Sequence, residues 1–140
     1  MFTKNFEEQL IAWRNLRDSL EQSAEPFQQV MQFYKQAPLR KISCDPWDQG
    51  NWASPWELLE ENEYCEFGIV LGMCYSLQLT DRFSETDFEI HICTNNETSE
   101  TCYLLFVDNT IINYKNSVVS REELPDALFS QRVYQMPKLQ

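Results

Sequence analysis

Several features that would identify a known chemistry are scarce in this 140-residue sequence. Three glycines are too few to build a glycine-rich phosphate-binding loop. The five cysteines are odd in number, form no CxxC pair and have only one histidine to join them in a ligand set. Such spacing indicates neither a disulfide framework nor a structural zinc site. We therefore expect free, mostly buried thiols, no metal and no cofactor.

Long apolar runs are also missing, since none approaches the roughly 20 residues that a membrane helix requires. The opening residues, MFTKNFEEQL, carry acidic groups where a secretory leader has a basic and then an apolar stretch. With free thiols, this favours a protein that is made and kept inside a cell, away from the membrane. The length and the 43% hydrophobic content predict a single globular domain over residues 1–140.

Positive charge is almost absent from the middle of the chain. Between Ile42 and Tyr114 there are fourteen acidic side chains and one basic one, Arg82, within a net charge of −11. A field of that sign repels nucleic acid and anionic lipid, so direct nucleic-acid binding is disfavoured. Solubility alone would explain such acidity. The sharper alternatives are a surface for a basic partner protein and a mimic of the charge of DNA.

The first part of the chain has helical periodicity. Asn5 and Glu8 match a capping box before an amphipathic helix, and Pro26 suits the first position of a second helix. The short turn between them predicts an antiparallel helical hairpin. A further helix, apolar almost all round, is expected over 63–78 with Asn62 as its cap. This helix should be the buried centre of the fold.

The hydrophobic period changes to two in the second part of the chain. Asp108-Asn109 is a two-residue hairpin signal between two apolar strands. Strands are expected at 87–92, 103–107, 110–114 and near 133–136. The predicted class is α+β, with a helical hairpin and a buried central helix (1–80) packed on a small antiparallel sheet (86–137).

Three tryptophans lie within ten residues, on a loop marked by Asp-Pro and Gln-Gly turn signals and at the helix start Ser54-Pro55. One interpretation is a loop pinned onto the core by its indoles. The other is a partner-binding surface with aromatic anchors and an acidic steering field. The candidate binding residues are Trp47, Trp52, Trp56, Asp45, Asp48 and Glu57.

Cys65, near the start of the buried helix and followed by antiparallel strands, resembles the layout of transglutaminase-like and papain-like cysteine enzymes. The resemblance implies a histidine on one strand and an aspartate on the next. The matching positions fall near Thr101 or Cys102 and near Asn113 or Tyr114. None of these residues is a histidine or an aspartate.

The only histidine, His91, lies one strand earlier, so an enzyme would have to pair Cys65 with His91. The acidic residues around Cys65, such as Glu60 and Glu66, would raise the pKa of its thiol against the effect of the helix dipole. We therefore expect no catalysis. A hydrolase or acyl transferase that uses Cys65 and His91 is the alternative.

Four long segments make the sequence distinctive: DPWDQGNWASPWELL, NEYCEFGIVLGMCYSLQLTDRF, FEIHI and YLLFVDNTIINY. In these segments the chain resembles uncharacterised proteins of tailed phages that infect cyanobacteria. The resemblance implies a virus-encoded protein of the host cytoplasm or the virion, and it implies no activity. The resulting hypothesis is a non-catalytic protein that binds a host or virion protein, with the cysteine enzyme and the acidic DNA mimic as alternatives.

Overall fold

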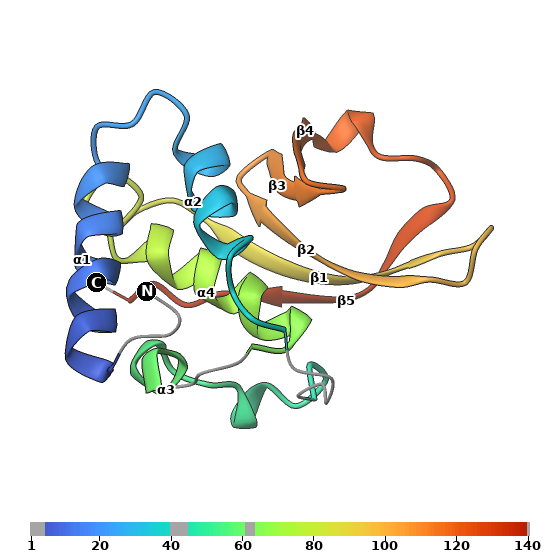
Figure 1. Cartoon of the computed structure of the whole chain (residues 1–140). Coiled ribbons are helices and arrows are strands. Elements are labelled where there is room, and N and C mark those ends of the chain that lie inside the picture. The colour runs from blue at the N-terminus through green and yellow to red at the C-terminus, as the bar shows by residue number, and fades with distance from the viewer. Residues whose placement is uncertain (1–4, 40–44, 61–63, 140) are drawn as a thin grey trace.

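Helices come first along the chain and strands second (Figure 1). The computed structural model describes residues 5–39, 45–60 and 64–139. The helical elements are α1 (Phe6–Leu20), α2 (Pro26–Tyr34), the 3-10 turn η1 (Gln49–Asn51), α3 (Pro55–Glu60) and α4 (Glu66–Gln78). The strands are β1 (Phe88–Asn95), β2 (Thr101–Val107), β3 (Thr110–Tyr114), β4 (Ser117–Ser120) and β5 (Leu128–Gln135), with a second 3-10 turn, η2 (Arg121–Glu123), before β5. The predicted α+β class is confirmed.

Two helices begin at side-chain caps that the sequence predicts. In α1 the Asn5 side chain accepts from the backbone N–H of Glu8 at 2.9 Å and donates to the Glu8 carboxylate at 3.1 Å. In α3 the backbone N–H of Glu57 donates to Ser54 Oγ at 3.3 Å, and the Glu57 carboxylate accepts from the Ser54 N–H at 3.2 Å. Both caps satisfy N–H groups that a helix leaves unpaired, and the cap of α3 is a complete capping box because Glu57 accepts from the backbone of Ser54.

Helix α4 is the buried centre of the molecule, as predicted, because eleven of its thirteen residues are buried. Its start differs from the prediction. The helix begins at Glu66, and its cap is Cys65, whose Sγ accepts from the Gly68 N–H at 3.1 Å. The predicted cap, Asn62, lies outside the described residues.

The helical layer is joined through the hydroxyl of Ser76 in α4. Ser76 Oγ donates to the backbone oxygen of Gly72 at 2.7 Å and accepts from Trp13 Nε1 of α1 at 2.8 Å. The Tyr34 hydroxyl of α2 lies 3.1 Å from the same oxygen. Because Ser76 uses its only hydrogen on Gly72, Tyr34 is the donor in this hydrogen bond. Tyr34 packs so closely that a Cβ added at Gly72 would lie 2.6 Å from its ring, which explains the glycine.

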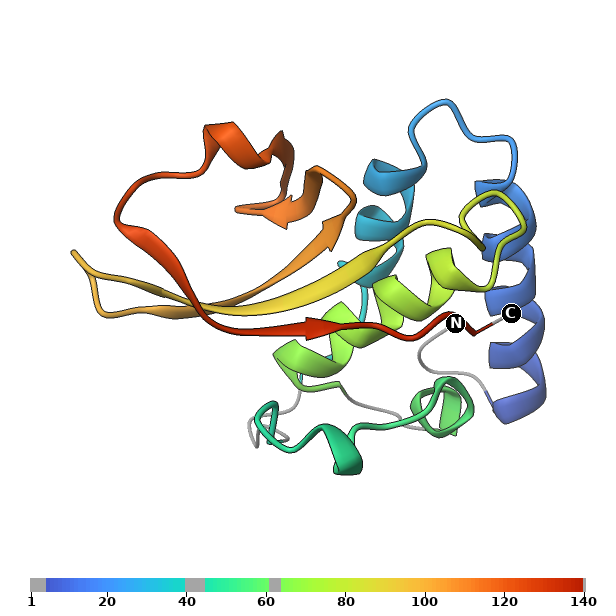
Figure 2. The ribbon, with the colours of Figure 1, turned by 180° about the vertical axis from the view of Figure 1, so that it is seen from behind.

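The strands form one antiparallel sheet in the order β4-β3-β2-β1-β5. On one face, residues such as Phe88, Ile90 and Leu105 share a core with the helices. The other face carries a smaller cluster built on Leu104 and Phe106. Figure 2 shows the β1–β2 hairpin and the segment between η2 and β5 extending away from the helices. Across the described ranges, no helix is long and apolar enough to cross a membrane.

The predicted hairpin turns at Asp108-Asn109, and Asp108 has a positive φ of 52°. Strand β4 was not predicted. It follows Lys115 and Asn116, which both adopt positive φ and close a second tight hairpin. Strand β5 begins at Leu128, five residues before the predicted 133, because its exposed first half has no apolar alternation to mark it.

Candidate functional site

Cys65 occupies the helix start that the sequence predicts, but it is not a free thiol. It is 2% exposed and disulfide-bonded. The expectation of five free cysteines is therefore wrong for this residue. Cys44 lies outside the described residues, whereas Cys74, Cys93 and Cys102 are free. A disulfide sulfur has no proton for a base to remove, so the helix dipole cannot generate a thiolate at Cys65 while the bond persists.

Tyr103 is the side chain of β2 that faces the start of α4. Its ring lies edge-on to Phe67, with 5.3 Å between centroids, and it packs against the helical core. Cys102, nearer the expected histidine position, packs against the cluster on the opposite face. Tyr103 shares its parity along the strand with Leu105 and Val107. The alternation of the strand could therefore have identified it.

Asn113 of β3 holds strands β2 and β3 together. It is one of the two residues expected at the aspartate position. Its amide nitrogen donates to the Tyr103 carbonyl at 2.9 Å, and its amide oxygen accepts from the Leu105 N–H at 2.9 Å. The direct pairing of β2 with β3 covers only the residues beside the turn. The amide therefore substitutes for backbone hydrogen bonds that these strands would otherwise exchange.

A cleft of about 370 Å³ lies among α2, α4, β2 and β3. Its lining includes Met31, Glu66, Ile69, Met73, Cys102, Tyr103 and Asn113. Cys65 is not among the lining residues. The cleft therefore combines an apolar floor with a few polar groups, as binding sites do. It lacks the imidazole that a cysteine enzyme needs, because the sequence contains only His91.

His91 lies on the face of the sheet that points away from the helices. Its ring stacks on Phe106, with 3.7 Å between centroids, and Phe106 belongs to the outer cluster. Cys65 packs in the helical core on the other side of the sheet. The structure therefore does not bring Cys65 and His91 together, and the alternative catalytic pair is not formed.

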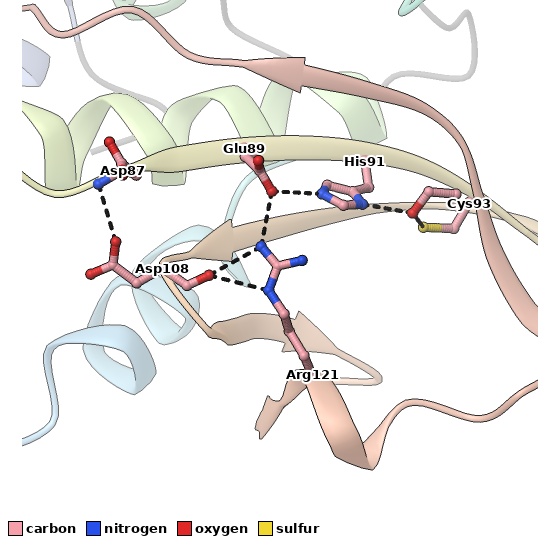
Figure 3. Close-up of polar contacts among 7 residues, drawn as sticks. Asp87, Glu89, His91, Cys93, Asp108 and Arg121 are labelled. Carbon is pink, nitrogen blue, oxygen red and sulfur yellow. Dashed lines mark hydrogen bonds and ion pairs between the residues drawn. The ribbon is translucent and has the colours of Figure 1, made fainter.

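His91 belongs to a chain of polar contacts on this outer face (Figure 3). Its Nε2 lies 3.0 Å from Glu89 Oε1, which also accepts from Arg121 at 2.9 Å. Its Nδ1 lies 2.6 Å from Ser130 Oγ. Burial lowers the pKa of His91, against the opposing effect of Glu89. The hydrogen bond to His91, together with Arg121, lowers the pKa of Glu89, so a neutral imidazole faces a carboxylate.

The tryptophan loop divides between the two interpretations. Trp52 pins the loop: its ring lies 4.9 Å from Phe67 and 4.6 Å from Tyr134, and its Nε1 donates to the Pro46 carbonyl. Trp47 is 49% exposed, although its carbonyl accepts from the Tyr134 hydroxyl, and Trp56 is 54% exposed. Trp47 and Trp56 are therefore the two exposed tryptophans of the loop.

The acidic candidates of this loop have local partners. Asp45 accepts from the Trp47 N–H at 3.0 Å, Asp48 accepts from the Asn51 amide, and Glu57 completes the capping box of α3. Each carboxylate thus shapes the loop while leaving its charge at the surface. Within residues 5–39, 45–60 and 64–139, no three His, Cys, Asp or Glu side chains gather as metal ligands would.

Comparisons with known proteins bear on the fold. No protein-family model matches the chain, and no curated protein matches it by sequence. Among solved structures it is similar to Legionella pneumophila LapG in its calcium-bound form, with a TM-score of 0.67 and 16% identity. The match covers 94% of this chain and 76% of LapG. LapG has a transglutaminase-like cysteine protease fold, so the predicted similarity to that fold is confirmed.

Proposed function

We propose that this protein is a non-catalytic binding module on a transglutaminase-like scaffold, and that it acts by holding another protein. One observation carries the proposal: Cys65, at the position where this layout needs a thiolate, is disulfide-bonded, and the predicted histidine position near Thr101 or Cys102 holds no histidine. The only histidine of the chain lies on the opposite face of the sheet, against Phe106. A scaffold without these groups can bind a polypeptide on its surface but has no means to cleave it.

The binding surface in this proposal is the acidic tryptophan loop. Trp47 offers a large, half-exposed indole on a backbone fixed by Asp45 and Tyr134. A rigid aromatic anchor loses little conformational entropy on binding, and such anchors commonly carry much of the binding energy. Asp45, Asp48 and Glu57 surround it with negative charge, which speeds encounter with a basic partner at low salt.

The setting follows from the sequence resemblance to cyanobacterial phage proteins, and the partner is then a host or virion protein. The similarity to LapG favours a second candidate, a cysteine-dependent hydrolase that acts once the disulfide of Cys65 is reduced. The third candidate is a mimic of the charge of DNA. Its binding would depend on the acidic side chains and not on the indole of Trp47.

Substitution of Trp47 by Ala tests the proposal directly. The immobilised protein captures partners from a lysate of infected cells, and the affinity of each purified partner is then measured for the wild type and the variants. We expect Trp47→Ala to weaken binding by about 2 kcal/mol or more, as at a hot spot, with the melting temperature unchanged. The matched control is Phe129→Ala, which removes another aromatic side chain of similar exposure, at 42%.

Other results would favour the rivals. Equal binding by the wild type and Trp47→Ala, with affinity that depends only on salt, would indicate the DNA mimic. For the hydrolase, the decisive measurement is alkylation of Cys65 at neutral pH after mild reduction. Labelling much faster than that of a model thiol would contradict the non-catalytic proposal.

A further inference from the structure

Two of the three free cysteines in the described part of the chain lie directly opposite each other in the sheet. Cys93 of β1 pairs with Cys102 of β2, and each thiol shifts the pKa of the other. Directly paired residues of antiparallel strands have Cα atoms about 4.5–5.5 Å apart. Disulfides span Cα separations of about 4.4–6.8 Å. A bond between these two sulfurs therefore requires little movement of the backbone.

A β-bulge supplies Cys93 with a polar neighbour. Along the β1–β5 pair, Ile92 faces Arg132 but Cys93 faces Ser130, so Gln131 is the extra residue. The bulge lets one hydroxyl reach two side chains of β1. Ser130 Oγ lies 3.7 Å from Cys93 Sγ and 2.6 Å from His91 Nδ1.

The direction of these hydrogen bonds follows from the carboxylate at the far end. Glu89 Oε1, held by Arg121, only accepts, so the neutral His91 carries its proton on Nε2. His91 Nδ1 then accepts from the Ser130 hydroxyl, whose oxygen is free to accept from the Cys93 S–H. A proton leaving Cys93 can therefore pass through Ser130 to His91, where Glu89 stabilises the imidazolium.

The two sulfurs differ in access. Cys93 is 2% exposed, whereas Cys102 is only partly buried, and both pack in the cluster on the outer face of the sheet. A small molecule that approaches the outer face therefore meets Cys102 first. The hydrogen bond from Cys102 lowers the pKa of Cys93 to about 7. The same hydrogen bond raises the pKa of Cys102, so the pair shares one readily lost proton.

We propose that Cys93 and Cys102 are a redox-active dithiol that reduces small disulfides and thereby closes a cross-strand disulfide between β1 and β2. In the first step Cys93 gives its proton to the Ser130–His91 relay, the Cys102 sulfur attacks the small disulfide while its own proton passes to the Cys93 thiolate, and one small thiolate leaves and takes up the proton held by His91. In the second step Cys93 passes its proton to the Ser130–His91 relay, attacks the Cys102 sulfur and releases the second small thiolate. Two protein thiols become one disulfide, and one small disulfide becomes two thiols.

This chemistry is independent of the protein binding proposed above, because it uses the outer face of the sheet. It also separates these cysteines from Cys74, the third free thiol. Cys74 is fully buried in α4, where burial raises the pKa of its thiol, and it donates to Gln78 within the helix. Cys74 is therefore an internal reference for an unreactive thiol.

Trypsin makes the test simple, because Phe83–Lys115 is a single tryptic peptide that contains Cys93 and Cys102 and no other cysteine. The native protein is incubated with 2-hydroxyethyl disulfide, quenched by alkylation, digested and analysed by mass spectrometry. A neutral disulfide is chosen because the chain carries a net charge of −11. We expect this peptide to lose both alkylatable thiols together, with the mass of an internal disulfide, and excess 2-mercaptoethanol to reverse the change.

The variants separate the steps. With Cys93→Ser, a mixed disulfide should accumulate on Cys102, and with Cys102→Ser the peptide should not react. Ser130→Ala removes the relay and should slow closure about tenfold, the equivalent of one hydrogen bond to a charged group. The control, Ser117→Ala on β4, should close at the wild-type rate. Thermal unfolding of each variant confirms that it is folded.

Three results would overturn the proposal. The dithiol is excluded if the wild-type peptide stays fully alkylatable or stops at a mixed disulfide. Reaction of Cys93 in the Cys102→Ser variant would reverse the assignment of the entry thiol. An unchanged rate in the folded Ser130→Ala variant would remove the relay from the mechanism.

Discussion

The two faces of the sheet bury side chains from the same strands but differ in chemistry. The helix-facing side holds Cys65, Tyr103 and Asn113 and uses each residue for structure. No sequence motif predicted a site on the outer side. It nevertheless brings the only histidine of the sequence into contact with a carboxylate and a hydroxyl, and the same hydroxyl contacts a thiol. The comparison shows that the face that resembles a known type of site and the face that carries the titratable side chains can be opposite faces of one sheet.

The largest effect expected on the helix-facing side is that of Trp52→Ala. The indole fills space between Phe67 and Tyr134, so its loss should lower the free energy of unfolding by about 3 kcal/mol. Chemical denaturation measures this directly. The half-exposed Trp56, on the same segment, is the matched control, and Trp56→Ala should cost less than about 1 kcal/mol. Equal costs would mean that the loop is not pinned through Trp52.

The two glycines of α4 test how closely the helices pack on this side of the sheet. Gly72→Ala forces a methyl group against Tyr34 and should destabilise the protein by about 1–3 kcal/mol. At Gly68 the new Cβ would lie 3.3 Å from Cys65 Sγ, a much milder contact. The gain in helix propensity of up to about 1 kcal/mol should leave Gly68→Ala nearly neutral. Urea midpoints of both variants decide whether only Gly72 is a point of close approach.

The smallest effect is a pH dependence that belongs to the outer side. The pKa of His91 in the folded protein lies below its ordinary value of 6.5, so below that pH the unfolded chain binds more protons. Stability should therefore fall as the pH drops from about 6.5, and the lowered pKa of Glu89 continues the loss below 4.5. Unfolding of His91→Gln between pH 7 and 5 should show a flatter profile.

The control for this experiment is Glu97→Gln, on the exposed β1–β2 turn, which should keep the wild-type slope. Arg121, Glu89 and Cys93 are the titratable groups nearest the imidazole, and all remain in both variants. A His91→Gln profile as steep as the wild type would show that the outer network does not set the pH dependence.

Much of the fold follows from local signals in the sequence. The caps at Asn5 and Ser54 depend on contacts three residues apart, and the hairpin at Asp108-Asn109 depends on two residues. Such short-range chemistry is readable because the partners are neighbours in the chain. Strand β4 was not predicted because the turn before it has no recognisable motif. Lys115 in this turn adopts a positive φ, which lysine rarely does.

The site was harder to predict because its contacts are distant in sequence. The bulge that brings Ser130 beside His91 inserts one residue into an exposed strand whose polar residues carry no periodic signal. The disulfide of Cys65 was missed because connectivity cannot be deduced from cysteine spacing alone. The alternation along β2 predicts that Tyr103 faces the helices, whereas the resemblance to cysteine enzymes pointed to Thr101 or Cys102.

The hydroxyl of Ser76 also has a consequence for how the protein opens. One oxygen accepts from Trp13 of α1 and Tyr34 of α2 while it donates within α4. If α4 moves away, the buried Trp13 N–H and the Tyr34 hydroxyl both lose the acceptor that they share, so both helices are coupled to α4 through one atom. The helical layer should therefore exchange its amide hydrogens as one cooperative unit, and the tip of the β1–β2 hairpin, which extends from the helices, should open independently.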